Sequence, residues 1–279
     1  MERALIVGCG DIGIAVGVTL AEGGWRAWGL RRTPDKLPGI LGEIIADIRT
    51  PLPLRALPDA IDTVFFLPTP DGRDRASYSD VYVTGLRNII DASSIGGPLR
   101  PRLIFVSSTS VYGQNAGEQV DEESVTEPRE FNGKVLLEAE EVALHCPFET
   151  LIARFGGIYG PGRLRLIDAV RGGAACQADP PRFTNRIHRD DCVRVLVHLA
   201  QRATPPGVLL AVDDAPAPEC EVWDFIADEL GAPRPPRAQV AGSGQGKRCQ
   251  NRKLKASGYH FHFPTYREGY RALISSLHI

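Results

Sequence analysis

The stretch ALIVGCGDIGIAVGVTLAEGG, from Ala4 to Gly24, decides the fold of this chain. It opens with a short apolar run, passes through closely spaced glycines, and continues as small residues with helical spacing from Ile12 to Ala21. The pair Gly23-Gly24 then supplies a helix end. The pattern therefore predicts a strand, a tight turn and a helix in immediate succession.

Three glycines in this turn, Gly8, Gly10 and Gly13, form the pattern G-x-G-x-x-G. Between a strand and a helix this pattern is typical of a dinucleotide-binding turn. The first glycine permits the turn, the second lets the backbone approach a pyrophosphate, and the third lets the helix pack on the strand. We expect the helix start, at Asp11 and Ile12, to direct its N–H groups at the phosphates. An ordinary glycine turn is the alternative interpretation.

Strand-like and helical segments alternate along most of the chain. Strand character recurs at Trp25–Leu30, Glu43–Asp47, Asp62–Pro68, Arg102–Ser108 and Phe148–Phe155. Helical spacing occurs at Tyr78–Ser93, Asn185–Gln201 and Glu219–Gly231. This alternation predicts an α/β fold, a Rossmann-type doubly wound parallel sheet with helices on both faces.

A smaller C-terminal substrate lobe is expected beside this sheet. We assign residues 1–154 and 183–207 to the dinucleotide-binding domain, and residues 155–182 and 208–279 to the lobe. A substrate would enter between the carboxyl edge of the sheet and the lobe. The stretch Ala232–Arg248 is rich in Pro, Gly and Ser and predicts a loop.

The end of the second predicted strand reads GLRRT, with Arg31 and Arg32 and no acid before Asp35. A site for NAD usually offers an acid there, whereas paired guanidinium groups suit a 2′-phosphate, so we expect NADP, with NAD as the alternative. Solvent-exposed arginines without a ligand are the other interpretation. Asp47 is expected near the adenine or as a helix N-cap, and Leu67 is expected to contact the cofactor at the end of the fourth strand.

Composition excludes several classes of protein. The 279 residues carry a net charge of −2, which gives no general attraction to nucleic acid or to an anionic membrane. Six scattered cysteines without a C-x-x-C pair argue against a zinc ribbon and against a thioredoxin-like site, and favour reduced thiols. The N-terminal apolar run is too short for a signal peptide or a membrane span, so we expect a cytoplasmic protein. No metal site is expected.

Four further motifs follow the glycine loop in a fixed order. They are FVSSTSVYG (Phe105–Gly113), KVLLEAE (Lys134–Glu140), ARFGGIYGPGR (Ala153–Arg163) and NRIHRDDC (Asn185–Cys192). Each motif alone is weak, but together they resemble the extended short-chain dehydrogenase/reductase family, in an atypical form. That family contains NAD-dependent sugar-nucleotide epimerases and dehydratases, and the resemblance covers nearly the whole chain.

The resemblance implies a catalytic set of Ser or Thr, Tyr and Lys. Ser108 matches the hydroxyl position, and Lys134 matches the lysine that holds the nicotinamide ribose. Glu130 stands where the family has its proton-transferring tyrosine, and Tyr82 stands where an asparagine is usual. Tyr159, in the loop that borders nicotinamide and substrate, is a further catalytic candidate.

Each of these assignments has a plainer alternative. Lys134 and Glu138 have the i,i+4 spacing of an ordinary surface pair. Tyr112 and Tyr159 lie near the motif loops and could turn toward the nicotinamide, but both can equally pack inside the protein. Asp191 is expected to cap the helix that follows it.

Two functions follow from these observations. The first is an NAD(P)-dependent oxidoreductase or epimerase/dehydratase-like enzyme acting on a small carbonyl, hydroxyl or nucleotide-sugar substrate. The second is a non-catalytic NADP(H)-binding redox sensor or regulatory protein, motivated by the missing tyrosine. The resemblance also implies a homodimer built on the helices at Tyr78–Ser93 and Lys134–His145, although their apolar residues could equally be core.

Overall fold

The computed structural model describes residues 1–53, 56–94, 101–202, 204–242 and 244–277. The chain forms two compact units. The first unit comprises Met1–Val111, Thr126–Arg154 and Val193–Leu209; the second comprises Tyr112–Val125, Phe155–Cys192 and Leu210–Ile279. Compared with the division expected from the sequence, residues 112–125 and 183–192 lie in the second unit, and residues 208–209 lie in the first.

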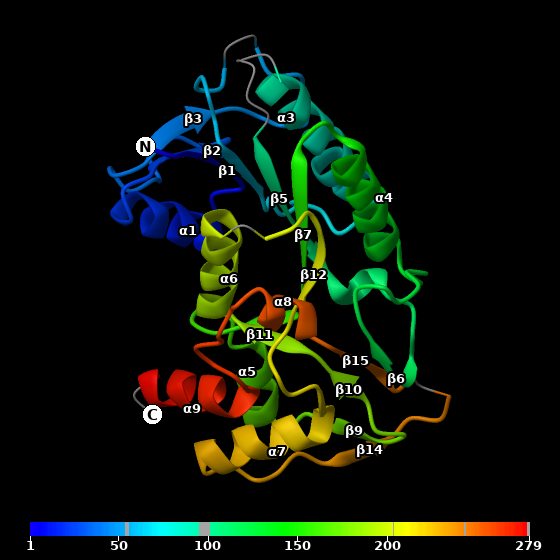
Figure 1. The fold of residues 1–279 in the computed structure, drawn as a ribbon. Coiled ribbons are helices and arrows are strands. Elements are labelled where there is room, and N and C mark those ends of the chain that lie inside the picture. The colour runs from blue at the N-terminus through cyan, green and yellow to red at the C-terminus, as the bar shows by residue number, and fades with distance from the viewer. Residues whose placement is uncertain (54–55, 95–100, 203, 243, 278–279) are drawn as a thin grey trace. The chain divides into compact units, whose positions relative to one another are not determined.

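A seven-stranded sheet has the strand order β12-β7-β5-β4-β1-β2-β3 (Figure 1). The pairs β1–β2, β2–β3, β1–β4 and β4–β5 are all parallel. This order, with the chain reversing direction across the sheet at β1, is that of a Rossmann fold and confirms the predicted fold class. The strands are β1 (Arg3–Val7), β2 (Arg26–Arg31), β3 (Gly42–Ile45), β4 (Thr63–Phe66), β5 (Arg102–Ser108), β7 (Glu149–Phe155) and β12 (Gly207–Ala211).

Helices cover both faces of this sheet. In Figure 1, α1 (Asp11–Glu22) and α6 (Arg189–Gln201) lie on one side, while α3 (Gly85–Ser94) and α4 (Phe131–His145) lie on the other. Because both faces are covered, the central strands are largely buried: all four residues of β4, Thr63–Phe66, are buried.

The helix predicted at Tyr78–Ser93 is made of three consecutive segments. They are α2 (Arg75–Ser79), the π-helical turn Asp80–Thr84 and α3. The helix predicted from Asn185 begins at Arg189, because Arg186–His188 form strand β11, which pairs with β8 (Gly157–Tyr159). A single turn of 3₁₀ helix, Thr109–Val111, follows β5.

A buried ion pair fixes α4 against the sheet. Glu140 on α4 is 1% exposed and accepts hydrogen bonds from the guanidinium group of Arg154 on β7, at 2.5–3.2 Å. The hydroxyl of Ser107 on β5 donates to the same carboxylate at 2.5 Å. Three elements therefore meet at one carboxylate, which sets both the position of α4 and its rotation about its own axis.

Replacing Glu140 with Leu should destabilise the protein by roughly 3–5 kcal/mol, because it removes the carboxylate that neutralises the buried guanidinium group. The double variant Glu140→Leu with Arg154→Met should recover most of that loss, since no buried charge then remains at this point. Urea unfolding followed by tryptophan fluorescence measures both values. If the free energy of unfolding of Glu140→Leu lies within about 1 kcal/mol of that of the unaltered protein, this pair does not have the stabilising role described.

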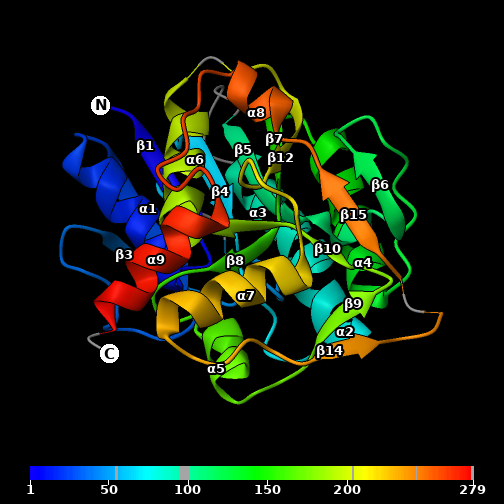
Figure 2. The same ribbon diagram turned by 90° about the horizontal axis from the view of Figure 1, so that it is seen from below.

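The second unit has a four-stranded sheet of order β13-β10-β15-β6 and a group of helices, α5, α7 and α9 (Figure 2). The pairs β8–β11 and β9–β14 form two smaller sheets. The remaining strands are β6 (Ala116–Val120), β9 (Cys176–Asp179), β10 (Phe183–Thr184), β13 (Ala217–Pro218), β14 (Arg237–Gln239) and β15 (Gly246–Cys249). The helices are α5 (Arg165–Arg171), α7 (Glu219–Leu230), α8 (Arg252–Ala256) and α9 (Tyr266–Ser276).

The segment Ala232–Arg248 is not the continuous loop that its composition predicts. It contains β14 and most of β15, which pair with β9 and β6 respectively. These partners are far away in the sequence, so the local excess of Pro and Gly could not indicate them.

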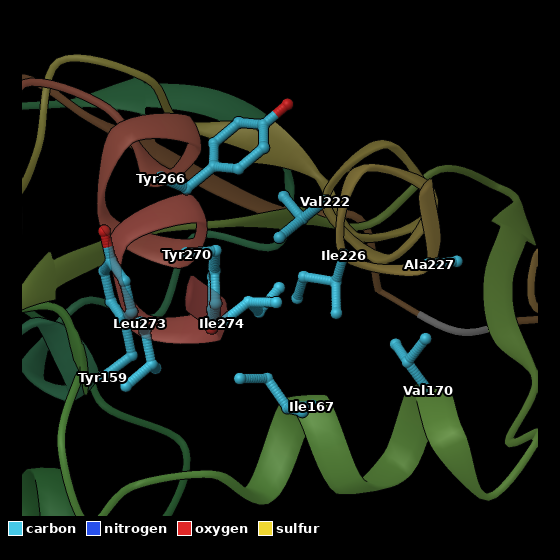
Figure 3. Close-up of a cluster of buried hydrophobic side chains, with 11 residues drawn as sticks. Tyr159, Ile167, Val170, Val222, Ile226, Ala227, Tyr266, Tyr270, Leu273 and Ile274 are labelled. Atoms are coloured by element: carbon cyan, nitrogen blue, oxygen red, sulfur yellow. The ribbon is translucent and has the colours of Figure 1, made fainter. Parts of the chain in front are cut away.

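Three helices of the second unit, α5, α7 and α9, share one apolar core. Ile167 and Val170 of α5, Val222 and Ile226 of α7, and the inner face of α9 point toward one another (Figure 3). The helix α9 starts with a capping box, in which Thr265 and Glu268 satisfy each other's backbone N–H groups.

One disulfide lies in this unit and corrects the expectation that all cysteines are reduced. Cys176 on β9 is bonded to Cys220 on α7. The other four cysteines, Cys9, Cys146, Cys192 and Cys249, are free. In the part of the chain that the structure describes, no helix is long and apolar enough to cross a membrane, and no group of three His, Cys, Asp or Glu residues could hold a metal.

Candidate functional site

The turn between β1 and α1 is held by contacts between backbones. Gly8 has φ +100°, and a Cβ there would lie 2.5 Å from the backbone of Pro68, just past β4. A Cβ on Gly13 would lie 2.4 Å from the carbonyl oxygen of Gly8. Both positions therefore require glycine, and Leu67, whose carbonyl carbon is 2.6 Å from the same Gly8 Cβ position, is brought beside the glycine loop.

Gly10 differs from these two glycines because the space beside it is open. A Cβ on Gly10 would have no heavy atom within 4 Å among the described residues, and its φ of −83° suits any residue. Gly10 is the N-cap of α1 and has no side chain with which to cap the helix. The first turn of α1, at Asp11 and Ile12, therefore begins beside an open space, which is the arrangement that an anionic group at a helix N-terminus requires.

The carboxyl ends of neighbouring strands bring the other cofactor candidates to the same edge. Val7 of β1 is paired with Leu30 of β2, so Gly8 and Arg31 follow at the same level. Arg31 is paired in turn with Ile45 at the end of β3. The Nε atom of Arg31 is buried and donates to no group within the described residues.

Arg32 does not stand free at this edge. Its Nη1 and Nη2 atoms donate to the two carboxylate oxygens of Asp71 at 2.6 and 2.7 Å. Asp71 lies in the loop after β4, 39 residues further along the chain. The two arginines predicted to act together therefore differ: Arg31 is partly buried, whereas the charge of Arg32 is already balanced by Asp71.

Asp47 is likewise engaged. Its carboxylate accepts from the backbone N–H of Arg49 at 3.0 Å and from the Arg49 guanidinium group at 2.5–3.1 Å. These hydrogen bonds lower the pKa of Asp47 to about 2. The following residues form a turn, in which Thr50 donates to the Asp47 carbonyl, so the predicted role of Asp47 as a helix N-cap is wrong.

Ser108 ends β5, at the same edge of the sheet. Its side chain is partly exposed, and its Oγ accepts from the backbone N–H of Ser110 at 3.1 Å. Because that bond uses an acceptor position of the oxygen, the hydroxyl proton remains able to donate to a substrate oxygen.

Glu130 and Lys134 lie at the start of α4. Glu130 is the N-cap, and its side chain is exposed and makes no capping hydrogen bond within the described residues. Lys134 is exposed too, as are Glu138 and Glu141, so Lys134 belongs to the solvent-facing stripe of α4. This position favours the interpretation of Lys134 as an ordinary surface residue, although no ion pair with Glu138 forms within the described residues, and the roles of Glu130 and Lys134 in catalysis stay predictions.

The opposite face of α4 carries different residues. A Cβ on Gly133 would lie 2.4 Å from the carbonyl oxygen of Ser110, so this face packs on the segment that follows Ser108. Leu136 and Glu140 continue the same face and are buried. Leu136, which lies one turn before Glu140 and also points inward, is thus an apolar residue at this position.

Tyr159 lies in the second unit and belongs to its core. It is 4% exposed and stacks on Tyr270 of α9 with ring centroids 4.3 Å apart (Figure 3). A Cβ on Gly269 would lie 1.8 Å from the Tyr159 hydroxyl oxygen, so that hydroxyl lies directly against α9. Burial, with a smaller effect of the Asp213 charge, raises the pKa of Tyr159. The packing interpretation is therefore favoured over the catalytic one.

Two buried charged residues near Tyr159 were not recognisable from sequence patterns. Arg186 on β11 is 6% exposed and Asp213, after β12, is 2% exposed. Within the described residues, Arg186 Nη1, Asp213 Oδ2 and the Tyr159 hydroxyl have no hydrogen-bond partner. Burial raises the pKa of Asp213 to about 7, although Arg186 opposes the shift.

The expected role of Asp191 as a helix cap is also corrected. Its buried carboxylate accepts from the Tyr259 hydroxyl at 2.6 Å and from the backbone N–H groups of His262 and Phe263 at 2.8 and 2.9 Å. Asp191 therefore anchors the segment before α9. Tyr112, in contrast, is buried as its packing interpretation requires, with its hydroxyl donating to the carbonyl of Asp121.

The stability of the protein should depend on pH through Asp213. The folded state raises this pKa from 3.8 to about 7, so it binds the proton more tightly than the unfolded state does. The contribution of Asp213 to the free energy of unfolding is therefore present below pH 4 and is lost as the pH rises from about 4 to 7. Between pH 5 and 7 the loss should be at most roughly 2 kcal/mol, and Asp213→Asn should abolish it.

Urea unfolding of both proteins across this pH range measures the difference, with Asp168→Asn, an exposed acid of α5, as the control for loss of one charge. An equal pH dependence in the unaltered protein and in Asp213→Asn would show that Asp213 does not titrate in this window.

Comparison with known proteins places this geometry in a family. No family model matches the sequence. A solved structure from Methylobacillus flagellatus, provisionally described as an NAD-dependent epimerase/dehydratase, is 34% identical and has a TM-score of 0.83, with 100% of this chain and 99% of that chain covered. The chain belongs to this NAD-dependent epimerase/dehydratase group of extended short-chain dehydrogenases/reductases.

Two further relatives extend the comparison. Protein YeeZ of Escherichia coli K12 is 29% identical over 281 residues, covering 95% of this chain and 97% of that protein. MoeE5, solved in complex with UDP-glucuronic acid and NAD, is 25% identical with a TM-score of 0.83, and 99% of each chain is covered.

Proposed function

We propose that this protein binds a nicotinamide dinucleotide and acts on a nucleotide sugar, as an epimerase/dehydratase-like oxidoreductase. The observation that carries the proposal is the glycine loop, with Gly8 and Gly13 packed against backbone and the space beside Gly10 open. The full-length likeness to MoeE5, which was solved with a UDP-sugar and NAD, supports the same substrate and cofactor class. The cytoplasm is the compartment that we expect for this activity.

In the proposed arrangement the pyrophosphate lies at the start of α1, beside Gly10. The adenosine ribose lies at the ends of β2 and β3, where the guanidinium groups of Arg31 and Arg32 can bind a 2′-phosphate and so favour NADP(H). NAD(H) is the alternative, because Asp71 already neutralises Arg32. The nicotinamide then extends along the carboxyl edge of the sheet toward β5. The cofactor would supply hydride transfer there, and Ser108 would hold the substrate oxygen by donating its hydroxyl proton.

The proton transfer that the family assigns to tyrosine is the step that this chain must perform differently. We propose Glu130 for this role, with Lys134 at the nicotinamide ribose. Glu130 is exposed, so a bound nucleotide sugar would have to cover its carboxyl group for it to exchange a proton efficiently.

A second candidate is a non-catalytic NADP(H)-binding sensor. It is favoured by the start of α4, where Glu130 and Lys134 face solvent and the inward position is the apolar Leu136. A protein of this kind would bind the dinucleotide without turning over a substrate.

Binding is tested first, by thermal unfolding with NADPH and with NADH. A ligand that binds only the native state stabilises it by about 2.7 kcal/mol at 100 times its Kd, so the Tm should rise with ligand concentration. Gly10→Ala should change the stability of the free protein by less than about 1 kcal/mol, because its Cβ enters open space. The same Cβ would occupy the pyrophosphate position and should lower the affinity at least about tenfold.

Gly39→Ala is the matched control, because its Cβ likewise meets no heavy atom of the described residues within 4 Å. If neither dinucleotide raises the Tm of the unaltered protein, the proposed function is wrong.

Turnover is tested next, with UDP-glucose and UDP-glucuronic acid and either dinucleotide, by nicotinamide absorbance and by NMR of the sugar. We expect Ser108→Ala and Glu130→Gln each to lower the rate about 10²-fold, since each removes a hydrogen-bonding or proton-transferring group from the reaction. Glu127→Gln, an exposed acid three residues before Glu130, is the control. Tight binding of NADPH with no turnover of either sugar would favour the sensor instead.

A further inference from the structure

The ion pair between Arg32 and Asp71 is open to a ligand. The two side chains are 47% and 64% exposed, and the pair is bidentate, with contacts of 2.6 and 2.7 Å. A guanidinium group has five N–H donors, and this arrangement uses one from each terminal nitrogen. The remaining donors of Arg32 and the remaining lone pairs of Asp71 can still bind a ligand.

Asp71 reaches Arg32 because of the way the strands are arranged. Arg32 directly follows β2, while Asp71 lies five residues beyond the end of β4, and β1 separates the two strands. The loop that carries Asp71 first passes the glycine loop, where Leu67 and Pro68 touch Gly8. It therefore runs from the proposed pyrophosphate position toward the proposed adenosine ribose.

The surrounding charges are balanced. Arg49 pairs with Asp47 beside this site, and both influence Asp71 electrostatically, as Arg32 does. The hydrogen bonds from Arg32 hold the pKa of Asp71 below its usual value, so Asp71 is ionised at neutral pH. These two pairs contribute no net charge, while Arg31 adds a positive charge at the end of β2 and Glu43 adds a negative charge on the neighbouring strand β3.

We propose that Asp71 sets the choice between NAD and NADP. It supplies, from the loop after β4, the acid that the end of β2 lacks. Its carboxylate accepts a hydrogen bond from a ribose 2′-hydroxyl, and its charge both neutralises Arg32 and repels a 2′-phosphate. Asp71 thus lowers the affinity for NADP relative to the affinity for NAD. This inference rests on the proposed binding of a nicotinamide dinucleotide and assigns a specificity residue to that site.

The test compares dissociation constants of NADPH and NADH by fluorescence titration for the unaltered protein and for Asp71→Asn. The amide keeps the shape of the side chain but removes the charge that repels the phosphate. We expect the ratio of affinities, NADPH over NADH, to rise about five- to tenfold. Higher salt should shrink this gain, because the site is exposed and its charges are screened.

Asp74→Asn is the matched control. Asp74 lies three residues further along the same loop, is exposed, and caps α2 through Ser77, a role that asparagine can also fill. It should leave the affinity ratio within about twofold, since it lacks the contact with Arg32 on which the proposed effect depends.

Each result has a distinct meaning. If both dinucleotides bind and Asp71→Asn leaves the ratio unchanged or lowers it, Asp71 does not set the choice, and the proposed function still stands. An equal rise in Asp74→Asn also overturns the inference, because general loss of negative charge would then explain it. If the unaltered protein binds neither dinucleotide, the proposed function and this inference both fail.

Discussion

The close approach of three backbone segments at Gly8 is the constraint on which the rest of the first unit depends. The turn after β1 touches the end of β4 at Pro68, and the first turn of α1 touches the turn itself through Gly13. Side chains could adjust to a poor fit, but backbone atoms at 2.4–2.6 Å from a Cβ position cannot. The start of α1 is consequently held at the carboxyl edge of the sheet. Because the neighbouring strands are parallel, they end at the same edge, and Arg31, Leu67 and Ser108 lie there as well.

The rotation of α4 is a second constraint, and it explains the exposed position of Lys134. Glu140 must face the sheet, since it binds Arg154 and Ser107 in the interior. Positions three and four residues before an inward residue share its face, whereas Lys134, six residues before Glu140, lies away from it. The same ion pair that anchors α4 therefore directs Lys134 to solvent and Leu136 inward. For this helix, stability and the position of the predicted catalytic groups have one physical cause.

Local sequence patterns were sufficient for six of the seven strands of the sheet and for the glycine loop, because strand periodicity and glycine spacing act between near neighbours; the edge strand β12 was not predicted. They failed wherever a partner lies far along the chain. The strands β14 and β15 depend on β9 and β6, and Asp191 depends on the segment near Tyr259. The disulfide between Cys176 and Cys220 likewise joins residues 44 apart. The solvent-facing side of α4 was nevertheless within reach of the sequence, since the spacing of Lys134, Glu138 and Glu141 is that of an exposed stripe.

The same pair of residue types serves different purposes in different surroundings. Arg154 and Glu140 are buried, so separating them exposes each to a low-dielectric interior and the pair is structural. Arg32 and Asp71 are solvated, so their attraction contributes little to folding and can be exchanged for contacts with a ligand at small cost. Asp213 and Arg186 are a third case. Both are buried, but they form no hydrogen bond with each other within the described residues, and burial instead raises the pKa of Asp213 to about 7. Burial and geometry, rather than the identity of the charged residues, thus separate a charge that holds the fold from one that can select a ligand.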